Sequence, residues 1–342
     1  ADDGWITDSP VYQATGPDSA PLELIQTIPT NGAGTHGVDF HKFEDGRTFF
    51  VTSSWGGKPG KHGGGENTVN NNIYEYDATS GKFLLSQAIS MTGSKGAQLF
   101  GDKFGNGGTN GAQRKLCAFA TTNGLVIYEL KSTDGGTTES WEQAQLMSEV
   151  KVDRIISFSI DTRTFLVAVK GGFNNYPTSH IYVSDSTGFV LLHDFHVEKA
   201  GKVEHFVKRA CSSCAEEHYM AIAVQRFPLL SGDTSGEFHG YFSQLWKFNA
   251  DPNVDRFVFD STLEDLGVVA GLHYWKDAGG FYNGKHMMIL ANLRIRNKYD
   301  VTTTLTHSQI FMLFDQATHA VPTTHPYIDD EGEQQMKKTH FF

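Results

Sequence analysis

The amino-acid sequence predicts an all-β protein, and two observations, composition and an internal repeat, support that prediction. The chain of 342 residues contains 25 Phe and 12 Tyr, which favour strands, and 36 Gly, which favour turns. Hydrophobic residues make up 39% and charged residues 20%, so the chain can bury a core. Its length does not require two domains, because a fold built by repetition grows with the number of repeats.

The repeat consists of a β-branched or Leu residue followed by an aromatic residue and then by turn residues. Five such segments begin at Ile73, Ile127, Ile181, Leu245 and Ile310, so successive starts are 54, 54, 64 and 65 residues apart. Each is preceded by an apolar run, and that run by a shorter strand ending in an aromatic residue. These aromatic residues are Phe40, Phe100, Phe158, Phe206 and Tyr274.

Four short antiparallel strands per repeat are typical of a propeller blade. We therefore predict a single β-propeller domain over residues 1–342, with about five four-stranded blades and flanking segments at 1–21 and 322–342. The fifth repeat lacks a clear fourth strand, whereas residues 24–28 have the fourth-strand pattern. We expect this N-terminal strand to close the ring against blade five, because closure removes free edges. Six or seven blades are the alternative.

The first two repeats carry a more specific pattern. Gln26-Thr-Ile28-Pro-Thr30-Asn-Gly32-Ala33 and Gln87-Ala-Ile89-Ser-Met-Thr92-Gly93-Ser94 are followed by a Phe, a short apolar strand and an Ile-Tyr pair. They resemble the EAR (EPTP) repeat, most clearly over residues 24–130. The resemblance implies an extracellular propeller that mediates protein recognition without catalysis of its own, and it transfers no catalytic residue. The usual seven repeats of that family cannot be counted here.

Charge and hydropathy restrict the partners. The formal net charge of −11 argues against nucleic acid and anionic membrane surfaces. No apolar run approaches the 18 residues needed to cross a bilayer. The chain begins at Ala1 rather than Met, which predicts a secreted protein whose leader has been removed.

Cysteine is scarce. We expect Cys211 and Cys214 to form a small disulfide across a loop, with a reduced pair as the alternative. A zinc site would need a second ligand pair, and no other Cys pair exists. Cys117, within an apolar run, is predicted to be a buried small hydrophobe.

Basic and aromatic residues gather on one predicted face, near the starts of the first strands and in the long loops. A polar pocket there would hold a carboxylate, a sulfate or sugar hydroxyls by charge-assisted hydrogen bonds. The alternative is that each basic residue pairs with a neighbouring carboxylate, such as Asp153 or Glu198. The predicted ligand-binding residues are His36, Trp55, Lys95, Arg154, Lys202, Arg226 and Arg294.

One residue before the aromatic of each first strand are Asp39, Leu99, Ser157, His205 and His273. Asp39, His205 and His273 are therefore the candidate acid–base residues, and the same set is the only candidate for a divalent metal. Histidines hydrogen-bonded between blades are the alternative. No cofactor is predicted.

Three functions remain open at this stage. The first is a secreted recognition module without catalysis, binding an extracellular protein, a glycan or a small anionic or polar molecule through its loop-rich face. The second is an enzyme, a hydrolase or an oxygen-using enzyme, acting on a small organic molecule in the axial pocket. The third is an extracellular structural or storage protein. No phosphate loop, calcium loop or esterase elbow is complete, and the sequence favours the first interpretation.

Overall fold

The computed structural model describes the chain over seventeen ranges. They are residues 9–14, 22–29, 34–55, 68–103, 113–133, 138–148, 152–170, 178–197, 200–209, 214–224, 243–250, 256–263, 267–276, 286–295, 309–313, 326–328 and 334–336. Every regular element within them is a β-strand. None of these ranges holds a helix with the length and apolar character to cross a membrane.

The strands form successive antiparallel sheets, and the predicted β-propeller architecture with about five blades is confirmed. The first blade contains β3 (Gly34–Lys42), β4 (Thr48–Trp55), β5 (Thr68–Asp77) and β6 (Lys82–Thr92). The second contains β7 (Ser94–Asp102), β8 (Arg114–Thr121), β9 (Gly124–Thr133) and β10 (Thr138–Met147). The third contains β11 (Arg154–Ile160), β12 (Arg163–Val169), β13 (Thr178–Ser184) and β14 (Phe189–His196).

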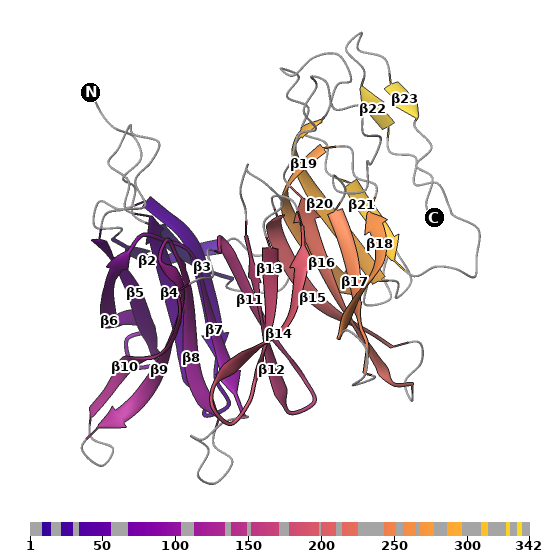
Figure 1. The fold of residues 1–342 in the computed structure, drawn as a ribbon. Helices are drawn as coiled ribbons and strands as arrows, with labels where there is room; N and C mark the ends of the chain where they lie inside the picture. Colours follow the sequence, from indigo (N-terminus) through magenta and orange to yellow (C-terminus); the bar gives the residue numbers. More distant parts are fainter. Residues whose placement is uncertain are drawn as a thin grey trace.

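The fourth blade contains β15 (Ala200–Arg209), β16 (Glu216–Val224), β17 (Ser243–Phe248) and β18 (Phe257–Leu263). The fifth is described over three strands, β19 (Gly267–Lys276), β20 (His286–Ile295) and β21 (Gln309–Leu313). Figure 1 shows the blades as a fan in chain order, with the first and fifth at opposite sides. Neighbouring blades contact each other along their first strands, in the order β3, β7, β11, β15 and β19.

The Ile/Leu-aromatic segments are the third strands of the five blades, as the repeat requires. The first residue of each segment lies opposite an apolar residue of the second strand. The pairs are Ile73 with Val51, Ile127 with Ala118, Ile181 with Val167, Leu245 with Ala221 and Ile310 with Ile289. These segments therefore occupy equivalent places in all five blades.

Each described fourth strand has a β-bulge opposite its Ile/Leu-aromatic pair. In the first blade Ile73 lies opposite Gln87 and Tyr74 opposite Leu85, so Ser86 is the extra residue. The same shift occurs in the second, third and fourth blades. A bulge bends the strand and increases its twist, which turns the outer edge of a blade toward its neighbour.

The bulge also places a glutamine that joins consecutive blades. The amide of Gln87 donates to the carbonyl of Trp141 over 3.0 Å and accepts from the Trp141 amide over 2.7 Å. Gln145 makes the same pair of bonds with the backbone of Phe189, at 2.8 and 2.9 Å. We call this arrangement the glutamine clamp; it links the fourth strand of one blade to the fourth strand of the next.

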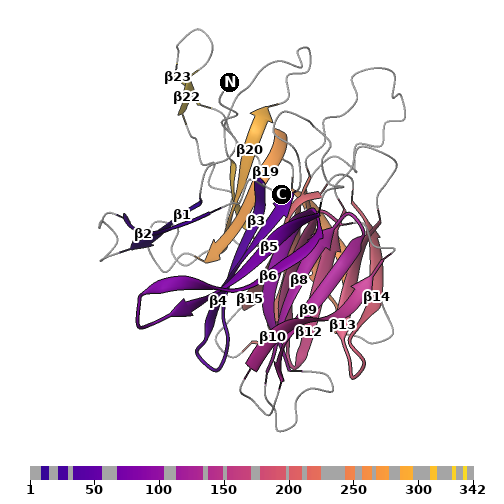
Figure 2. The same cartoon turned by 90° about the vertical axis from the view of Figure 1, so that its left-hand side faces the viewer.

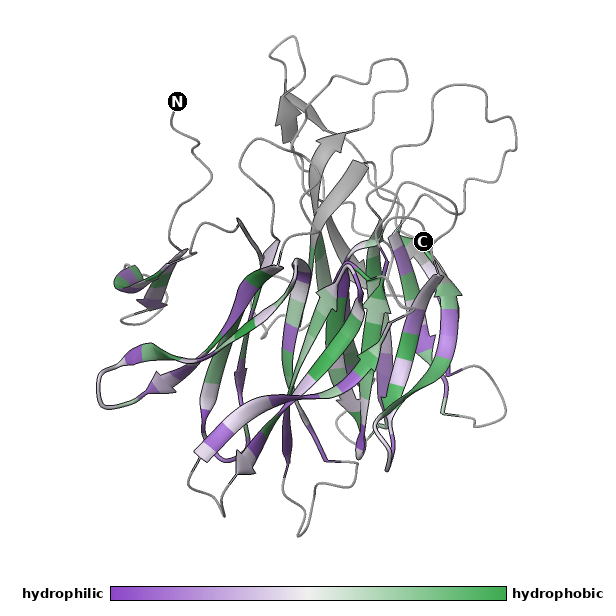
Figure 3. Cartoon of the chain, turned by 60° about the vertical axis from the view of Figure 1, so that its left-hand side comes forward, coloured by the Kyte–Doolittle hydropathy of each residue, from purple (hydrophilic) through white to green (hydrophobic). Residues whose placement is uncertain are grey.

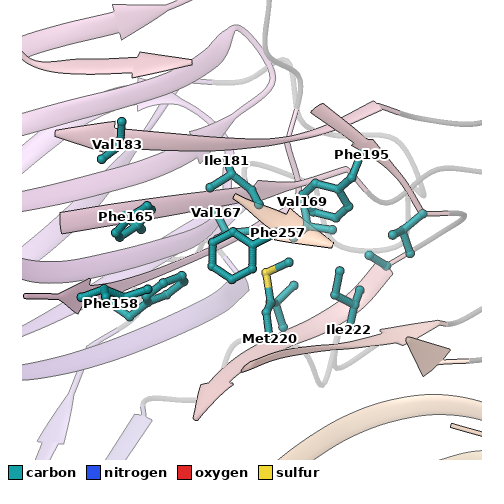
Figure 4. Packing of buried hydrophobic residues seen from close by; sticks show 14 residues of the cluster. Phe158, Phe165, Val167, Val169, Ile181, Val183, Phe195, Met220, Ile222 and Phe257 are labelled. Carbon is teal, nitrogen blue, oxygen red and sulfur yellow. The ribbon is translucent and has the colours of Figure 1, made fainter. Parts of the chain in front are cut away.

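Hydrophobic side chains from facing blades form the core. Between the third and fourth blades, Phe158, Val167, Met220 and Phe257 belong to one cluster, and Phe257 is completely buried. Figure 4 shows these side chains pointing toward one another from the two sheets. In Figure 3 hydrophobic residues are concentrated along the strands in the middle of the fan.

The N-terminal strand is placed differently from the expected ring closure. β2 (Leu22–Ile28) pairs with β1 (Ser9–Ala14) in a two-stranded sheet, and not with a described strand of the fifth blade. Figure 2 shows the two as a separate pair beside the first blade. Gln26 makes a glutamine clamp there, donating to the Phe83 carbonyl and accepting from its amide, both over 2.8 Å. β2 therefore has the position of a fourth strand, although its sheet partner is β1.

The C-terminal flank contains a second two-stranded sheet, in which β22 (Pro326–Ile328) pairs with β23 (Gln334–Met336). Cys117 is free and completely buried, as predicted. Burial raises the pKa of its thiol well above the usual value. Cys211 lies outside the described residues, so its disulfide with Cys214 stays a prediction. The division into one domain with flanks at 1–21 and 322–342 likewise stays a prediction.

Candidate active site on the first strands

Sheet register changes which first-strand residues are equivalent. Counted from the second-strand residue that faces the repeat Ile or Leu, the equivalent positions are Asp39, Gln98, Ile156, Glu204 and His273. The sequence alignment on the aromatic residue instead placed Leu99, Ser157 and His205 at this position. The aromatic residues of the first and fifth blades are one residue out of phase with the other three. A shift of one residue moves a side chain to the opposite face of a strand.

Asp39 is the most strongly perturbed carboxyl group on the first strands. Its Oδ2 accepts a hydrogen bond from the Leu99 amide over 2.6 Å and from Gln98 Nε2 over 2.9 Å. These bonds lower its pKa, but burial has the larger effect and raises the pKa of Asp39 to about 6. The group therefore exchanges its proton near neutral pH.

Glu204, the equivalent carboxylate of the fourth blade, repeats this arrangement. Its Oε1 accepts from the Tyr274 amide over 3.0 Å and lies 3.1 Å from His273 Nδ1. Leu99 and Tyr274 both follow directly after the equivalent positions Gln98 and His273. Glu204 Oε2 is buried and has no hydrogen-bond partner among the described residues. A buried oxygen without a partner costs free energy, so a second group is expected to bind it.

His205, an expected acid–base residue, faces the interface between the third and fourth blades. Its ring stacks on Phe158 with centroids 4.0 Å apart, and its Nε2 lies 3.1 Å from His218 Nδ1. Burial, followed by the repulsion from His218, lowers the pKa of His205 to about 3. A histidine that stays neutral at physiological pH and stacks on a phenylalanine is a packing residue, so the alternative of a buried, hydrogen-bonded histidine holds here.

His273 differs from His205, because two thirds of its side chain is exposed and its described partner is Glu204. The described contacts of Asp39, His205 and His273 thus lead to three different partners: Leu99, His218 and Glu204. The described ranges contain no group of three His, Cys, Asp or Glu side chains that could hold a metal ion. The metal set considered from sequence is therefore not assembled.

Trp55, Lys95 and Arg154 are brought together at the first three blades. Lys95 Nζ lies 4.7 Å from the centre of the Trp55 ring and forms an ion pair with Asp153. Arg154 Nη1 donates to the Lys95 carbonyl over 2.6 Å, and its Nε to the Gly201 carbonyl over 3.3 Å. Three of the predicted binding residues therefore meet, and the two cations also tie neighbouring blades together.

Lys202 has the same blade-linking role, because its Nζ donates to the Leu272 carbonyl over 2.6 Å. The alternative considered from sequence, pairing with a carboxylate, holds for Lys95 alone, since Arg154 and Lys202 bind main-chain carbonyls. The side chains of His36 and Arg294 and all of Arg226 lie outside the described residues. For these three, ligand binding stays a prediction.

Sequence reasoning missed Glu204 and Gln98. The signal that could have found them is the distance from the second-strand residue facing the repeat Ile or Leu, rather than from the first-strand aromatic. That distance depends on sheet register, which bulges in β3, β7, β15 and β19 shift.

Comparison with known proteins gives likeness at the level of structure. No protein-family model matches the chain, and no curated protein is similar to it in sequence. The GH93 α-L-arabinofuranosidase of Fusarium graminearum with arabinobiose is 12% identical; the match covers 82% of this chain and 78% of that chain, with a TM-score of 0.44. A fructofuranosidase from Schwanniomyces occidentalis with fructose is 11% identical over 82% of this chain and 62% of its own, with a TM-score of 0.38.

A thermostable family-43 glycoside hydrolase is 11% identical over 90% of this chain and 93% of its own, with a TM-score of 0.37. At these identities the likeness is one of fold. The solved structures found are glycoside hydrolases, and this finding corrects the first interpretation from sequence, a recognition module without catalysis. The EAR repeat family, from which that interpretation drew, is not shown by any family model.

Proposed function

We propose that the chain is a hydrolase of glycosidic bonds, with Asp39 as its proton donor and Glu204 as the second carboxyl group. The observation that carries the proposal is the pKa of Asp39, which burial raises to about 6 on a first strand. A general acid works best when its pKa lies near the working pH. Most glycoside hydrolases use one carboxylic acid to protonate the leaving oxygen and a second carboxylate as base or nucleophile.

The hydrogen bonds explain how the two groups take different roles. Asp39 is fixed by the Leu99 amide and Gln98, which leaves Oδ1 for the proton that it would donate. Glu204 is fixed through Oε1 alone, and its Oε2 has no described partner. A water or a substrate hydroxyl would satisfy that oxygen.

Trp55 and Lys95 support a carbohydrate as the substrate class. An aromatic ring beside a polar group suits a sugar, which has an apolar ring face and polar hydroxyls. In this proposal Trp55 stacks on the sugar, while Lys95, Arg154 and Lys202 keep the first strands in place. His36, Arg226 and Arg294 are proposed as further contacts to the substrate.

An extracellular location belongs to the same proposal, together with the Cys211–Cys214 disulfide, which an oxidising compartment would preserve. The resemblance of residues 24–130 to the EAR repeat is retained as a resemblance of blade structure. Gln26 and Gln87, which open its two phrases, are both glutamine-clamp residues. The phrase therefore has a structural function that requires no shared ligand.

The test measures hydrolysis of a panel of nitrophenyl glycosides and plant and fungal oligosaccharides. We expect Asp39→Asn and Glu204→Gln each to reduce kcat/KM by roughly 100-fold or more, because each removes an acid–base or nucleophilic group. Asp77→Asn, which changes an exposed turn carboxylate, is the matched control and should leave kcat/KM unchanged.

The pH profile separates the acid from a merely structural group. If Asp39 donates the proton, wild-type kcat/KM should fall above about pH 6, where its carboxyl group loses that proton. Full activity in Asp39→Asn, or no hydrolysis of any glycan in the panel by the wild type, would overturn the proposal.

A further inference from the structure

We propose that β1 and β2 are the third and fourth strands of a sixth blade, whose first and second strands are β22 and β23. The two ends of the chain would then form one four-stranded sheet and close the ring between the fifth and first blades. This inference does not depend on the proposed catalytic function.

The first observation is that β1 has the repeat signature of a third strand. Val11-Tyr12 is a β-branched residue followed by an aromatic one, and it begins 62 residues before Ile73-Tyr74, within the spacing of the other repeats. Val11 lies opposite Gln26 and Tyr12 opposite Leu24, so Ile25 is the extra residue of a bulge. This is the bulge found opposite the Ile/Leu-aromatic pair in the first four blades.

The second observation is that β2 contacts the first blade as a preceding fourth strand would. Gln26 clamps Phe83 with the geometry by which Gln87 clamps Trp141. Ile28, two residues after Gln26, is 1% exposed in a cluster with Phe83. Ile89, two residues after Gln87, is buried with Trp141 in the same way. The outer half of a preceding blade is therefore already in place.

The third observation is an apolar face on β3, where the inner half of that blade would pack. Val38 and Phe40 are 58% and 57% exposed. Tyr274, the aromatic residue in the same phase in the fifth blade, stacks on Phe206 of the preceding first strand with centroids 4.3 Å apart. By this equivalence, Phe40 lacks the aromatic residue of a preceding first strand.

The C-terminal hairpin supplies the two strands that β1 and β2 need. β22 and β23 pair antiparallel, as first and second strands do, and Tyr327 of β22 lies opposite Gln335 of β23. Asp330-Glu-Gly332 in their connection resembles Glu44-Asp-Gly46, the turn between β3 and β4. The complete sheet would have the order β22-β23-β1-β2, in which Tyr327 takes the place of the aromatic residue beside Phe40.

The equivalence also fixes the register. Asp39 and Phe40 lie opposite Val51 and Phe50, while Pro326 and Tyr327 lie opposite Met336 and Gln335. Val51 faces Ile73 in the first blade, so Met336 should face Val11, and Gln335 should face Tyr12. In Figure 1 the hairpin lies beyond the fifth blade and β2 beside the first, so closure brings the two pairs together.

The test is a cysteine pair, Tyr12→Cys with Gln335→Cys, in the full chain. Directly opposed residues of antiparallel strands have Cα atoms about 4.5–5.5 Å apart, a distance that a disulfide spans. We expect mild oxidation to link the two positions within one chain, detected by mapping peptides without reduction. The matched control pairs Gln335→Cys with Tyr76→Cys, another exposed tyrosine, and should give at least about tenfold less of its crosslink.

A second measurement does not require a substitution within the strands. Deleting residues 323–342 should accelerate amide hydrogen exchange in 9–14 and 34–42 by about tenfold or more, and leave exchange in 163–169 unchanged. Crosslinks between two chains would assign the face to a second copy and overturn the proposal. So would equal crosslinking in the test and control pairs, or unchanged exchange in 9–14 after the deletion.

Discussion

The interface between the third and fourth blades and the interface between β2 and the first blade are built differently. The first contains a cluster of fourteen buried residues drawn from both complete sheets. The second contains three buried residues, Ile28, Tyr74 and Phe83, while Phe40 nearby is 57% exposed. The difference shows that the outer strands are fixed by a local device, the glutamine clamp, whereas the inner strands are held by packing against a first strand of the preceding blade.

The largest effect is expected from the interface that is fully packed. Phe257→Ala should lower the free energy of unfolding by about 3–5 kcal/mol, because it leaves a cavity among side chains that cannot close around it. The matched control is Phe259→Ala, two residues along the same strand and 52% exposed, which should cost less than about 1 kcal/mol. Urea unfolding of both variants measures the difference. Equal costs would mean that the cluster does not hold the two blades together.

An intermediate effect, dependent on pH, is expected at the same interface. The pKa of His205 is about 3 in the folded protein, below its usual value of 6.5, so the unfolded chain binds the proton first as pH falls. Stability is then complete above pH 6.5 and decreases by on the order of 3 kcal/mol between pH 7 and pH 4. Burial also lowers the pKa of the neighbouring His218, on which the charges of Glu216 and Asp161 act in the opposite direction.

Replacement of the titrating ring tests this expectation. His205→Phe preserves the stacking on Phe158 and removes the proton-binding group, so its unfolding free energy should change less between pH 7 and pH 4 than that of the wild type. His273→Gln, at an exposed histidine, is the control and should keep the wild-type acid sensitivity. The same pH dependence in His205→Phe and the wild type would assign the acid sensitivity to other groups.

The smallest effect compares the two clamps directly. Gln87→Ala removes two hydrogen bonds to the Trp141 backbone and should cost about 2 kcal/mol. If β2 belongs to a complete sixth blade, Gln26→Ala should cost the same amount, because it removes the same two bonds at Phe83. Thermal and urea unfolding measure both. A cost near zero for Gln26→Ala would show that the β1–β2 pair detaches from the first blade at little expense.

Much of the architecture could be predicted because each blade repeats one pattern. Ile73-Tyr74 and its counterparts mark third strands, since a β-branched residue followed by an aromatic one suits a strand buried between neighbours. Turn residues such as Asp77 to Gly81 then mark where the strand ends. The same reasoning placed Leu24–Ile28 correctly as a fourth strand, but gave it the wrong sheet partner, because it did not include Val11-Tyr12 as a sixth repeat.

The candidate site was predicted only in part. Asp39 was identified because the aromatic residue of the first blade is in phase with the sheet register, and His205 was misassigned because that of the fourth blade is not. Glu204, one residue before His205, points to the other face of β15 and was missed. The basic residues Lys95, Arg154 and Lys202 were expected to face a ligand, yet their described bonds are to Asp153 and to main-chain carbonyls of neighbouring blades.

The sequence by itself determined the strands, their repetition and the aromatic and apolar residues that make a β-propeller, since these depend on local preference and on period. The tertiary structure decided the register between strands, the protonation of Asp39 and His205, and the clamps between blades. The physical reason is that a side chain's face and its desolvation depend on residues far away in the chain, which only the assembled sheets bring together.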